Sequence, residues 1–89
     1  MEYEEFDTLT RATVRGFMGR LPEKYHDGFN GMLFAGELRL AVDQLTKGLE
    51  RLQIPVTPAE RDNLVRMLAY LKEPASRLDG LTIASESDN

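Results

Sequence analysis

This chain of 89 residues contains no cysteine and no tryptophan, and its only histidine is His26. Without cysteine the chain cannot form a disulfide, and it lacks the thiolate ligands of common structural zinc sites. Its stability must therefore come from packed apolar side chains, and hydrophobic residues make up 42% of the sequence. That fraction is too high for a chain that remains disordered, so we expect the sequence to fold.

Long hydrophobic runs are also absent, because no stretch approaches the ~20 apolar residues that a membrane-spanning helix needs. The first residues include Glu2, Glu4 and Glu5, whereas a secretory signal begins with basic residues and continues into an apolar run. We therefore expect a cytoplasmic protein that has no membrane partner.

An excess of positive charge is missing as well. The formal net charge is −4, whereas proteins that bind nucleic acids gather lysine and arginine on one face to contact phosphates. The acidic residues are unevenly distributed, and Glu2, Glu4, Glu5 and Asp7 follow one another with no lysine or arginine between them. Such a cluster is usually a solvated terminus. The overall charge favours a basic partner over a nucleic acid.

Residue combinations that would support catalysis or metal binding are not found. A single histidine leaves few arrangements for acid–base or nucleophilic chemistry, and we interpret His26 as a structural residue that is exposed or half-buried. The sequence has no His-x-x-x-His pair, no EF-hand loop and no phosphate-binding loop, although it contains seven glycines. It predicts a protein that is not an enzyme and that has no metal or cofactor.

Apolar residues recur at helical spacing in four segments of the chain. These run from Tyr3 to about Met18, from Pro22 towards Gly36, from Glu37 to about Leu52, and from Thr57 to just before Pro74. The second segment is the weakest, because Gly28 and Gly31 each lower its helical stability by about 1 kcal/mol. The sequence therefore predicts an all-α fold, a compact bundle of about four helices.

The third segment has the most regular pattern and is expected to be the central helix. Its apolar stripe consists of Leu38, Ala41, Val42, Leu45, Leu49 and Leu52. Gly36 is expected to end the preceding helix in a left-handed conformation. The fourth helix has a complete start signal, with Thr57 as the N-cap, Pro58 at the first helical position and Glu60 placed to bond back to the cap.

We predict a single domain over residues 1–74, because a chain of this length cannot divide into two parts that each bury a core. Residues 75–89 are predicted to be a C-terminal tail that is partly or wholly mobile. Leu78, Leu81 and Ile83 are the only anchors in this tail, and the residues after them have nothing to bury.

The richest cluster of large apolar residues comprises Phe29, Met32 and Phe34. The three cannot share one narrow face of a helix with about 3.6 residues per turn, so we expect at least one to be exposed. An exposed aromatic residue beside acids would be a suitable anchor for a protein interface. A filled corner of the core is the alternative interpretation.

The middle of the chain resembles a known family. The residues concerned are Gly36-Glu37-Leu38-Arg39-Leu40-Ala41-Val42-Asp43-Gln44-Leu45, then Leu49, then Ile54-Pro55-Val56-Thr57-Pro58-Ala59-Glu60. This pattern is similar to that of the small MafI-type immunity proteins of bacterial polymorphic toxin systems, and the similarity covers roughly residues 21–71. The sequence departs from it in the glycine-rich second segment and in the tail from Ala75 onward. The resemblance implies a four-helix cytoplasmic protein that binds the toxic domain of a cognate effector, often a nuclease, and blocks it.

The function predicted from these observations is that of an immunity protein, present as a monomer or weak dimer, whose partner is a toxin domain with a basic surface. An acidic surface would increase both the association rate and the charge complementarity with such a partner. The predicted partner-binding residues are Glu2, Glu4, Glu5, Asp7, Glu37 and Asp43.

Two alternatives remain open at this point. One is a small helical DNA-binding regulator that reads bases with Arg61, Asn63 and Arg66 of the fourth helix, although Glu60 and Asp62 would then face phosphates. The other is an oligomerising adaptor that associates with itself through the apolar residues of the second segment.

Overall fold

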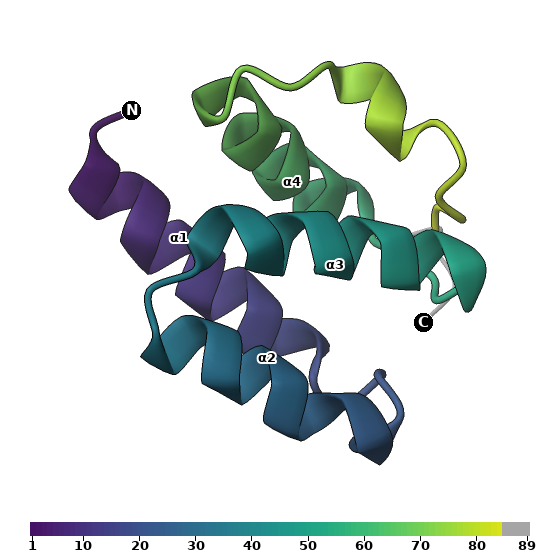
Figure 1. Cartoon of the computed structure of the whole chain (residues 1–89). Helices are drawn as coiled ribbons and strands as arrows, with labels where there is room; N and C mark the ends of the chain where they lie inside the picture. The colour runs from purple at the N-terminus through teal and green to yellow at the C-terminus, as the bar shows by residue number, and fades with distance from the viewer. Residues whose placement is uncertain (85–89) are drawn as a thin grey trace.

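Four α-helices and two short 3-10 turns account for most of residues 1–84, which are the residues that the computed structural model describes. The elements are α1 (Tyr3–Phe17), η1 (Glu23–Tyr25), α2 (His26–Phe34), α3 (Leu38–Arg51), α4 (Pro58–Tyr70) and η2 (Ala75–Leu78) (Figure 1). The predicted all-α class and the four predicted helices are confirmed. The second helix begins later than expected, because Pro22 is extended and residues 23–25 form a 3-10 turn before α2.

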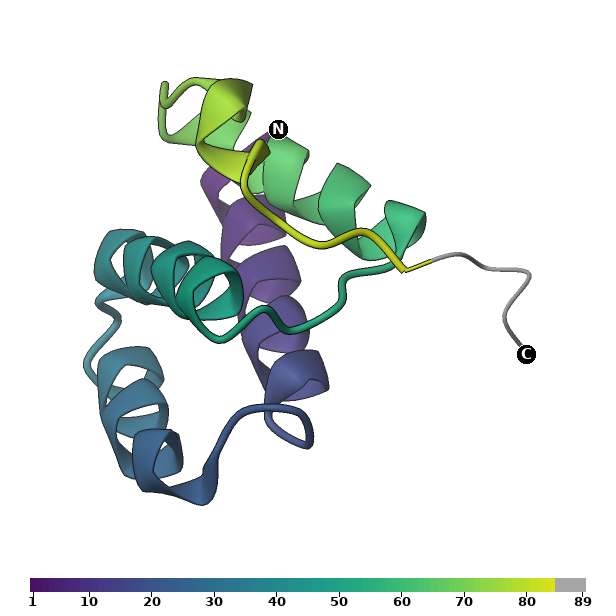
Figure 2. The same cartoon turned by 90° about the vertical axis from the view of Figure 1, so that its right-hand side faces the viewer.

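Helix α3 lies between the other elements. It contacts α1, α2 and η2, while α4 packs against α1 and η2. Helices α2 and α3 diverge from the connection that joins them, as Figures 1 and 2 show from two directions. Helix α2 is therefore held on one side of the molecule and contributes its apolar face to α3.

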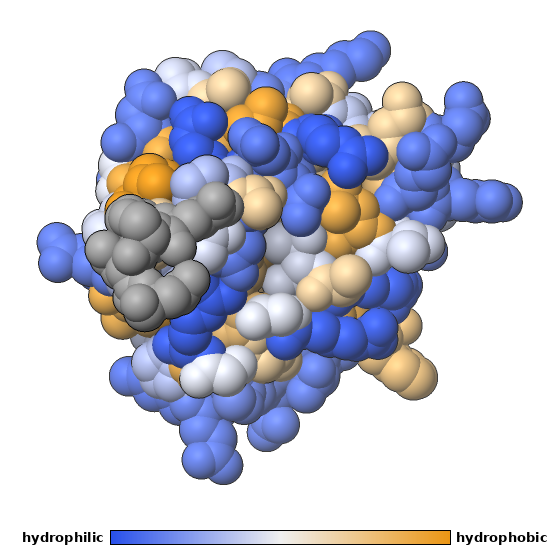
Figure 3. Space-filling view, turned by 180° about the vertical axis from the view of Figure 1, so that it is seen from behind, coloured by the Kyte–Doolittle hydropathy of each residue, from blue (hydrophilic) through white to orange (hydrophobic). Residues whose placement is uncertain are grey.

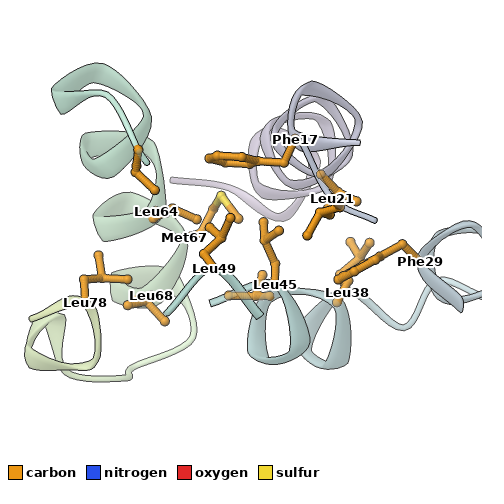
Figure 4. Close-up of a cluster of buried hydrophobic side chains, with 14 of the residues drawn as sticks. Phe17, Leu21, Phe29, Leu38, Leu45, Leu49, Leu64, Met67, Leu68 and Leu78 are labelled. Atoms are coloured by element: carbon orange, nitrogen blue, oxygen red, sulfur yellow. The ribbon is translucent and has the colours of Figure 1, made fainter. Parts of the chain in front are cut away.

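The core extends from α2 at one end to η2 at the other. Figure 4 shows Phe29 and Leu38 facing one another at the α2 end, and Leu68 and Leu78 at the opposite end. Between them lie side chains from α1, the connection after it, α3 and α4, namely Phe17, Leu21, Leu45, Leu49, Leu64 and Met67, all buried. The predicted stripe of α3 is buried from Leu38 to Leu49, but Leu52 is 37% exposed because α3 ends at Arg51.

The capping box at the start of α4 is confirmed. The Oγ1 of Thr57 accepts a hydrogen bond from the Glu60 N–H at 3.1 Å, and Glu60 Oε1 accepts one from the Thr57 N–H at 2.9 Å. Val56, which precedes the cap, is buried. These contacts fix where α4 begins and how the chain enters it.

Helices α2, α3 and α4 end in the same way. Each is followed by a residue with positive φ: Gly36 (72°), Gln53 (52°) and Lys72 (60°). The next N–H then bonds to a carbonyl in the last turn of the helix, as Glu37 does to Met32 at 2.8 Å. This is the Schellman arrangement. The left-handed conformation predicted for Gly36 is confirmed, whereas glutamine and lysine adopt it at the other two helix ends.

The residues after α4 pack on the helices as far as the structure describes them. Leu78 is 1% exposed and Leu81 is 8% exposed. Val56 and Ile83 form a parallel bridge, in which the Val56 N–H bonds to the Thr82 carbonyl at 2.8 Å. Residues 75–84, the described part of the predicted tail, therefore belong to the packed structure and contact α3 and α4 through η2. The rest of the predicted tail, residues 85–89, lies outside the described residues.

Within residues 1–84, no helix combines the length and the apolar character that crossing a membrane would require.

Candidate partner-binding surface

The first acidic residues lie on the surface at the start of α1. Glu2 occupies the N-cap position without a side-chain capping bond, and Glu4 and Glu5 lie in the first turn, all three exposed. A carboxylate is favourable there because the first turn carries the positive end of the helix dipole. Glu4 and Glu5 line a shallow hollow together with Arg66 of α4. These acids therefore stand where a partner can reach them.

Asp7 lies further along α1 and takes part in a contact between helices. Its carboxylate accepts a hydrogen bond from Arg11 Nε, and Arg11 Nη1 donates to the Leu33 carbonyl at 2.8 Å. That carbonyl belongs to the last turn of α2, where unpaired carbonyls favour a positive charge. Asp7 and Arg11 thus connect α1 to the end of α2, and both side chains are only partly exposed.

Phe34 is the exposed member of the predicted apolar cluster. It is 95% exposed, while Phe29 and Leu33 on the other side of α2 are buried. Glu37, three residues later, is also exposed and makes no side-chain cap for α3. We refer to Phe34 and Glu37, at the connection between α2 and α3, as the acidic corner. The expectation that at least one residue of the cluster is exposed is confirmed.

Asp43 on α3 lines a hollow together with Glu37 and Arg39, and it has intramolecular partners. Its carboxylate pairs with Lys47 at 3.1 Å and with Arg77 at 2.6 Å, and Arg77 also pairs with Glu73 at 3.5 Å. Burial by itself raises the pKa of Asp43. The hydrogen bonds from Lys47 and Arg77 together lower this pKa by more, so the net shift is downward. Asp43 therefore fastens η2 to α3.

The six predicted acids are thus divided among three places. Glu2, Glu4 and Glu5 lie at the start of α1, Asp7 pairs with Arg11 next to the end of α2, and Glu37 and Asp43 line one hollow with Arg39 and Arg77. On the face shown in Figure 3, polar and apolar side chains alternate in small patches.

An ionic contact that no local sequence pattern indicates joins the segment after α1 to the start of α4. Arg20 forms two hydrogen bonds to the Glu60 carboxylate and a third to the Pro55 carbonyl at 3.0 Å, and its guanidinium lies 4.4 Å from the Phe17 ring centre. The hydrogen bond from Arg20 holds the pKa of Glu60 below its ordinary value. The carboxylate of Glu60 is consequently occupied both by the cap at Thr57 and by Arg20.

His26 has a structural contact, in agreement with its interpretation from the sequence. The ring is half-buried, and its Nε2 lies 3.0 Å from the Leu21 carbonyl oxygen. In the part of the chain that the structure describes, no group of three or more histidine, aspartate or glutamate side chains could hold a metal ion.

A groove between α2 and α3 is the second surface feature, and sequence reasoning missed it. It has a volume of about 210 Å³. Its lining comprises Leu21, Lys24, Tyr25, Gly28, Phe29, Met32, Gln44, Gly48, Arg51 and Leu52. From the sequence, Gly28 is predicted to weaken a helix and Leu52 is predicted to be a core residue. Only the divergence of α2 from α3 turns both into the walls of one groove.

No protein-family model, no curated protein and no solved structure matches this chain. The resemblance to MafI-type immunity proteins accordingly stands on the residues quoted above.

Proposed function

We propose that this chain is an immunity protein that binds a cognate bacterial toxin domain and neutralises it by covering its active or substrate-binding surface. The observation that carries the proposal is Phe34, 95% exposed at the acidic corner. Leaving such a side chain in water forgoes about 1.5–3 kcal/mol of burial energy. Aromatic side chains near the centre of an interface supply a large share of its binding energy. Phe34 is therefore the anchor, and the partner supplies an apolar recess for it.

The charges around Phe34 support a basic partner. Glu37, three residues after Phe34, is exposed, and the exposed acids at the start of α1 add charge of the same sign. A toxin that acts on nucleic acid presents a basic cleft, to which an acidic protein associates quickly at low salt. This charge pattern supports occlusion of a substrate cleft as the mode of inhibition.

The predicted partner-binding residues differ in whether they already have partners within the chain. Asp7 and Asp43 have intramolecular partners, so substituting them would disturb folding as well as binding. No ion pair within residues 1–84 involves the carboxylate of Glu2, Glu4, Glu5 or Glu37. Substituting these residues therefore tests binding with less effect on the fold.

The experiment is to produce the chain in bacteria together with the toxic domain encoded next to its gene, and to measure survival. The wild-type chain is expected to restore growth, and the two purified proteins are expected to bind in calorimetry. Phe34→Ser is expected to weaken binding by about ten-fold or more, a loss of about 1.4 kcal/mol per factor of ten. Ile83→Ser is the matched control, because Ile83 is also an exposed apolar residue but lies beside Val56, which precedes α4. A chain that neither binds nor protects would contradict the proposal.

The role of charge is tested by a second pair of variants. Glu37→Lys is expected to lower the association rate at low salt and to reduce its dependence on salt. Asp62→Lys makes the same change of charge at an exposed position of α4, away from the acidic corner, and is expected to have a smaller effect. Equal effects of the two variants would show that net charge alone matters and that the corner is not the contact.

A further inference from the structure

The groove between α2 and α3 differs in charge from the acidic corner and lies towards the other end of α2. Its residues on and before α2 are Lys24, Tyr25, Gly28, Phe29 and Met32, whereas Phe34 ends the helix. We propose that this groove receives one bulky apolar side chain from an acidic segment of a protein partner. The inference stands whether or not that partner is a toxin.

The size of the groove sets the size of its occupant. Pockets for small-molecule ligands usually have volumes of about 300–1,000 Å³, whereas a cavity of about 150 Å³ accepts a benzene ring. The groove, at about 210 Å³, fits a single aromatic or branched side chain. Its apolar lining consists of Leu21, Phe29, Met32 and Leu52. A side chain presented by a protein segment matches these dimensions.

The rim of the groove is basic in a chain that is acidic overall. Lys24 Nζ lies 5.3 Å and the Arg51 guanidinium carbon 6.0 Å from the centre of the Tyr25 ring, and Arg51 also donates to the Tyr25 hydroxyl at 3.3 Å. Among the residues that the structure describes, neither cation has a carboxylate within 4 Å. Two cations gathered on one aromatic ring, beside an apolar lining, select a segment that carries carboxylates next to its apolar side chain.

Two glycines keep the groove open. Gly28 on α2 and Gly48 on α3 both line it, and a Cβ built at either position meets no atom within 4 Å. Neither has the positive φ that would require glycine. Each therefore lowers helix stability by about 1 kcal/mol relative to alanine without permitting a closer contact between the helices. Their effect is to leave space for an occupant that the isolated chain does not provide.

This geometry allows a test in which loss of binding cannot be due to unfolding. Gly28→Leu fills the groove and raises helix propensity, so it is expected to increase the unfolding temperature while abolishing binding. Gly31→Ala is the matched control, because it raises the propensity of the same helix but Gly31 does not line the groove. It is expected to increase the unfolding temperature and to leave binding unchanged.

The probe is a five-residue peptide with phenylalanine between two pairs of glutamates, titrated into the full isotope-labelled chain and followed by NMR. The amide signals of Gly28 and Gly48 are expected to shift and to saturate. Peptides with lysines in place of the glutamates, or alanine in place of phenylalanine, are expected to bind roughly ten-fold more weakly. The proposal is overturned if these two signals do not move, or if Gly28→Leu binds the peptide as well as the wild-type chain does.

Two further measurements would identify other occupants of the groove. If 3-phenylpropionate alone binds as tightly as the peptide, the groove is a small-molecule site and the proposal fails. If the wild-type chain dimerises in sedimentation and Phe34→Ser abolishes the dimer, the occupant is the exposed Phe34 of a second copy, and the proposal fails in favour of self-association. A monomer that binds the peptide more tightly than the small molecule supports it.

Discussion

Two threonines lie buried in the core and differ in their hydrogen bonds. Thr46 Oγ1 donates to the carbonyls of Val42 at 3.0 Å and Asp43 at 3.1 Å and accepts from Arg77 at 3.4 Å, whereas Thr10 Oγ1 has no partner among the described residues. A buried hydroxyl without a partner costs about 1–3 kcal/mol, and valine has nearly the same shape as threonine. Thr10→Val is therefore expected to raise the free energy of unfolding by about 1 kcal/mol, measured by urea denaturation.

Thr46→Val serves as the control, because it removes hydrogen bonds that are formed. It is expected to leave stability unchanged or to lower it by about 1 kcal/mol. If Thr10→Val destabilised the chain as much as Thr46→Val, the Thr10 hydroxyl would have a partner after all.

The residues that follow the helices test the cost of a left-handed backbone. The left-handed conformation costs a residue with a Cβ about 1–2 kcal/mol, and glycine does not have this cost. Gly36→Ala is therefore expected to lower the melting temperature, while Gln53→Gly is expected to raise it by relieving the same cost at the end of α3. Both changes are measured by thermal unfolding, and shifts of the same sign would contradict this account of the helix ends.

At the level of the helices, the contact between α1 and α4 makes stability depend on pH. The pKa of Glu60 in the folded chain lies below its ordinary value of 4.5, chiefly because Arg20 donates hydrogen bonds to the carboxylate. The folded state thus favours the ionised form. The stabilisation is complete above pH 4.5 and is lost as the pH falls through the lowered pKa of Glu60. Asp43, whose pKa is also lowered, contributes a loss in the same direction.

Glu60→Gln is expected to unfold more easily than the wild-type chain at neutral pH and to lose less stability on acidification, because glutamine can keep the cap but not the ion pair. Thr57→Ala removes the cap instead, and is expected to lower stability by about 1 kcal/mol while Arg20 and Glu60 still make it pH-dependent. Denaturation curves between pH 7 and pH 3 separate the two. An unchanged pH profile for Glu60→Gln would show that other carboxylates dominate.

For the molecule as a whole, the last described turn is part of the core. Leu78 on η2 is 1% exposed and contacts the α3 and α4 end of the cluster in Figure 4. Leu78→Ala is therefore expected to lower the free energy of unfolding by about 2–5 kcal/mol. Leu40→Ala, at a position that is 45% exposed on α3, is expected to change it by less than about 1 kcal/mol.

Removing residues 75–89 also tests whether the residues after α4 contribute to the stability of the chain. The shortened chain is expected to be less stable than Leu78→Ala, because it also loses Leu81, the bridge at Val56 and the Arg77–Asp43 ion pair. A shortened chain as stable as the wild type would support the predicted boundary at residue 74.

Charge and shape divide α2 between two surfaces of opposite sign. Its C-terminal end presents Phe34 beside Glu37, and its N-terminal half borders the groove with Lys24 and Arg51 on the rim. A short helix rich in glycine, stabilised mainly by its contact with α3, is thus available for binding on two sides.

Local patterns were enough to predict the all-α class, the course of α3, the left-handed Gly36 and the capping box at Thr57. Each depends on residues within one or two helical turns, where spacing and side-chain chemistry act directly on the backbone. The buried Leu78, the Arg20–Glu60 and Arg77–Asp43 contacts and the groove join residues that are far apart along the chain. Their proximity follows from how the helices pack, and spacing along the chain does not encode it. For the same reason, the sequence indicated the sign of the surface charge, and the packing decided that Phe34 is exposed, that Asp43 is occupied and that α2 borders an open groove.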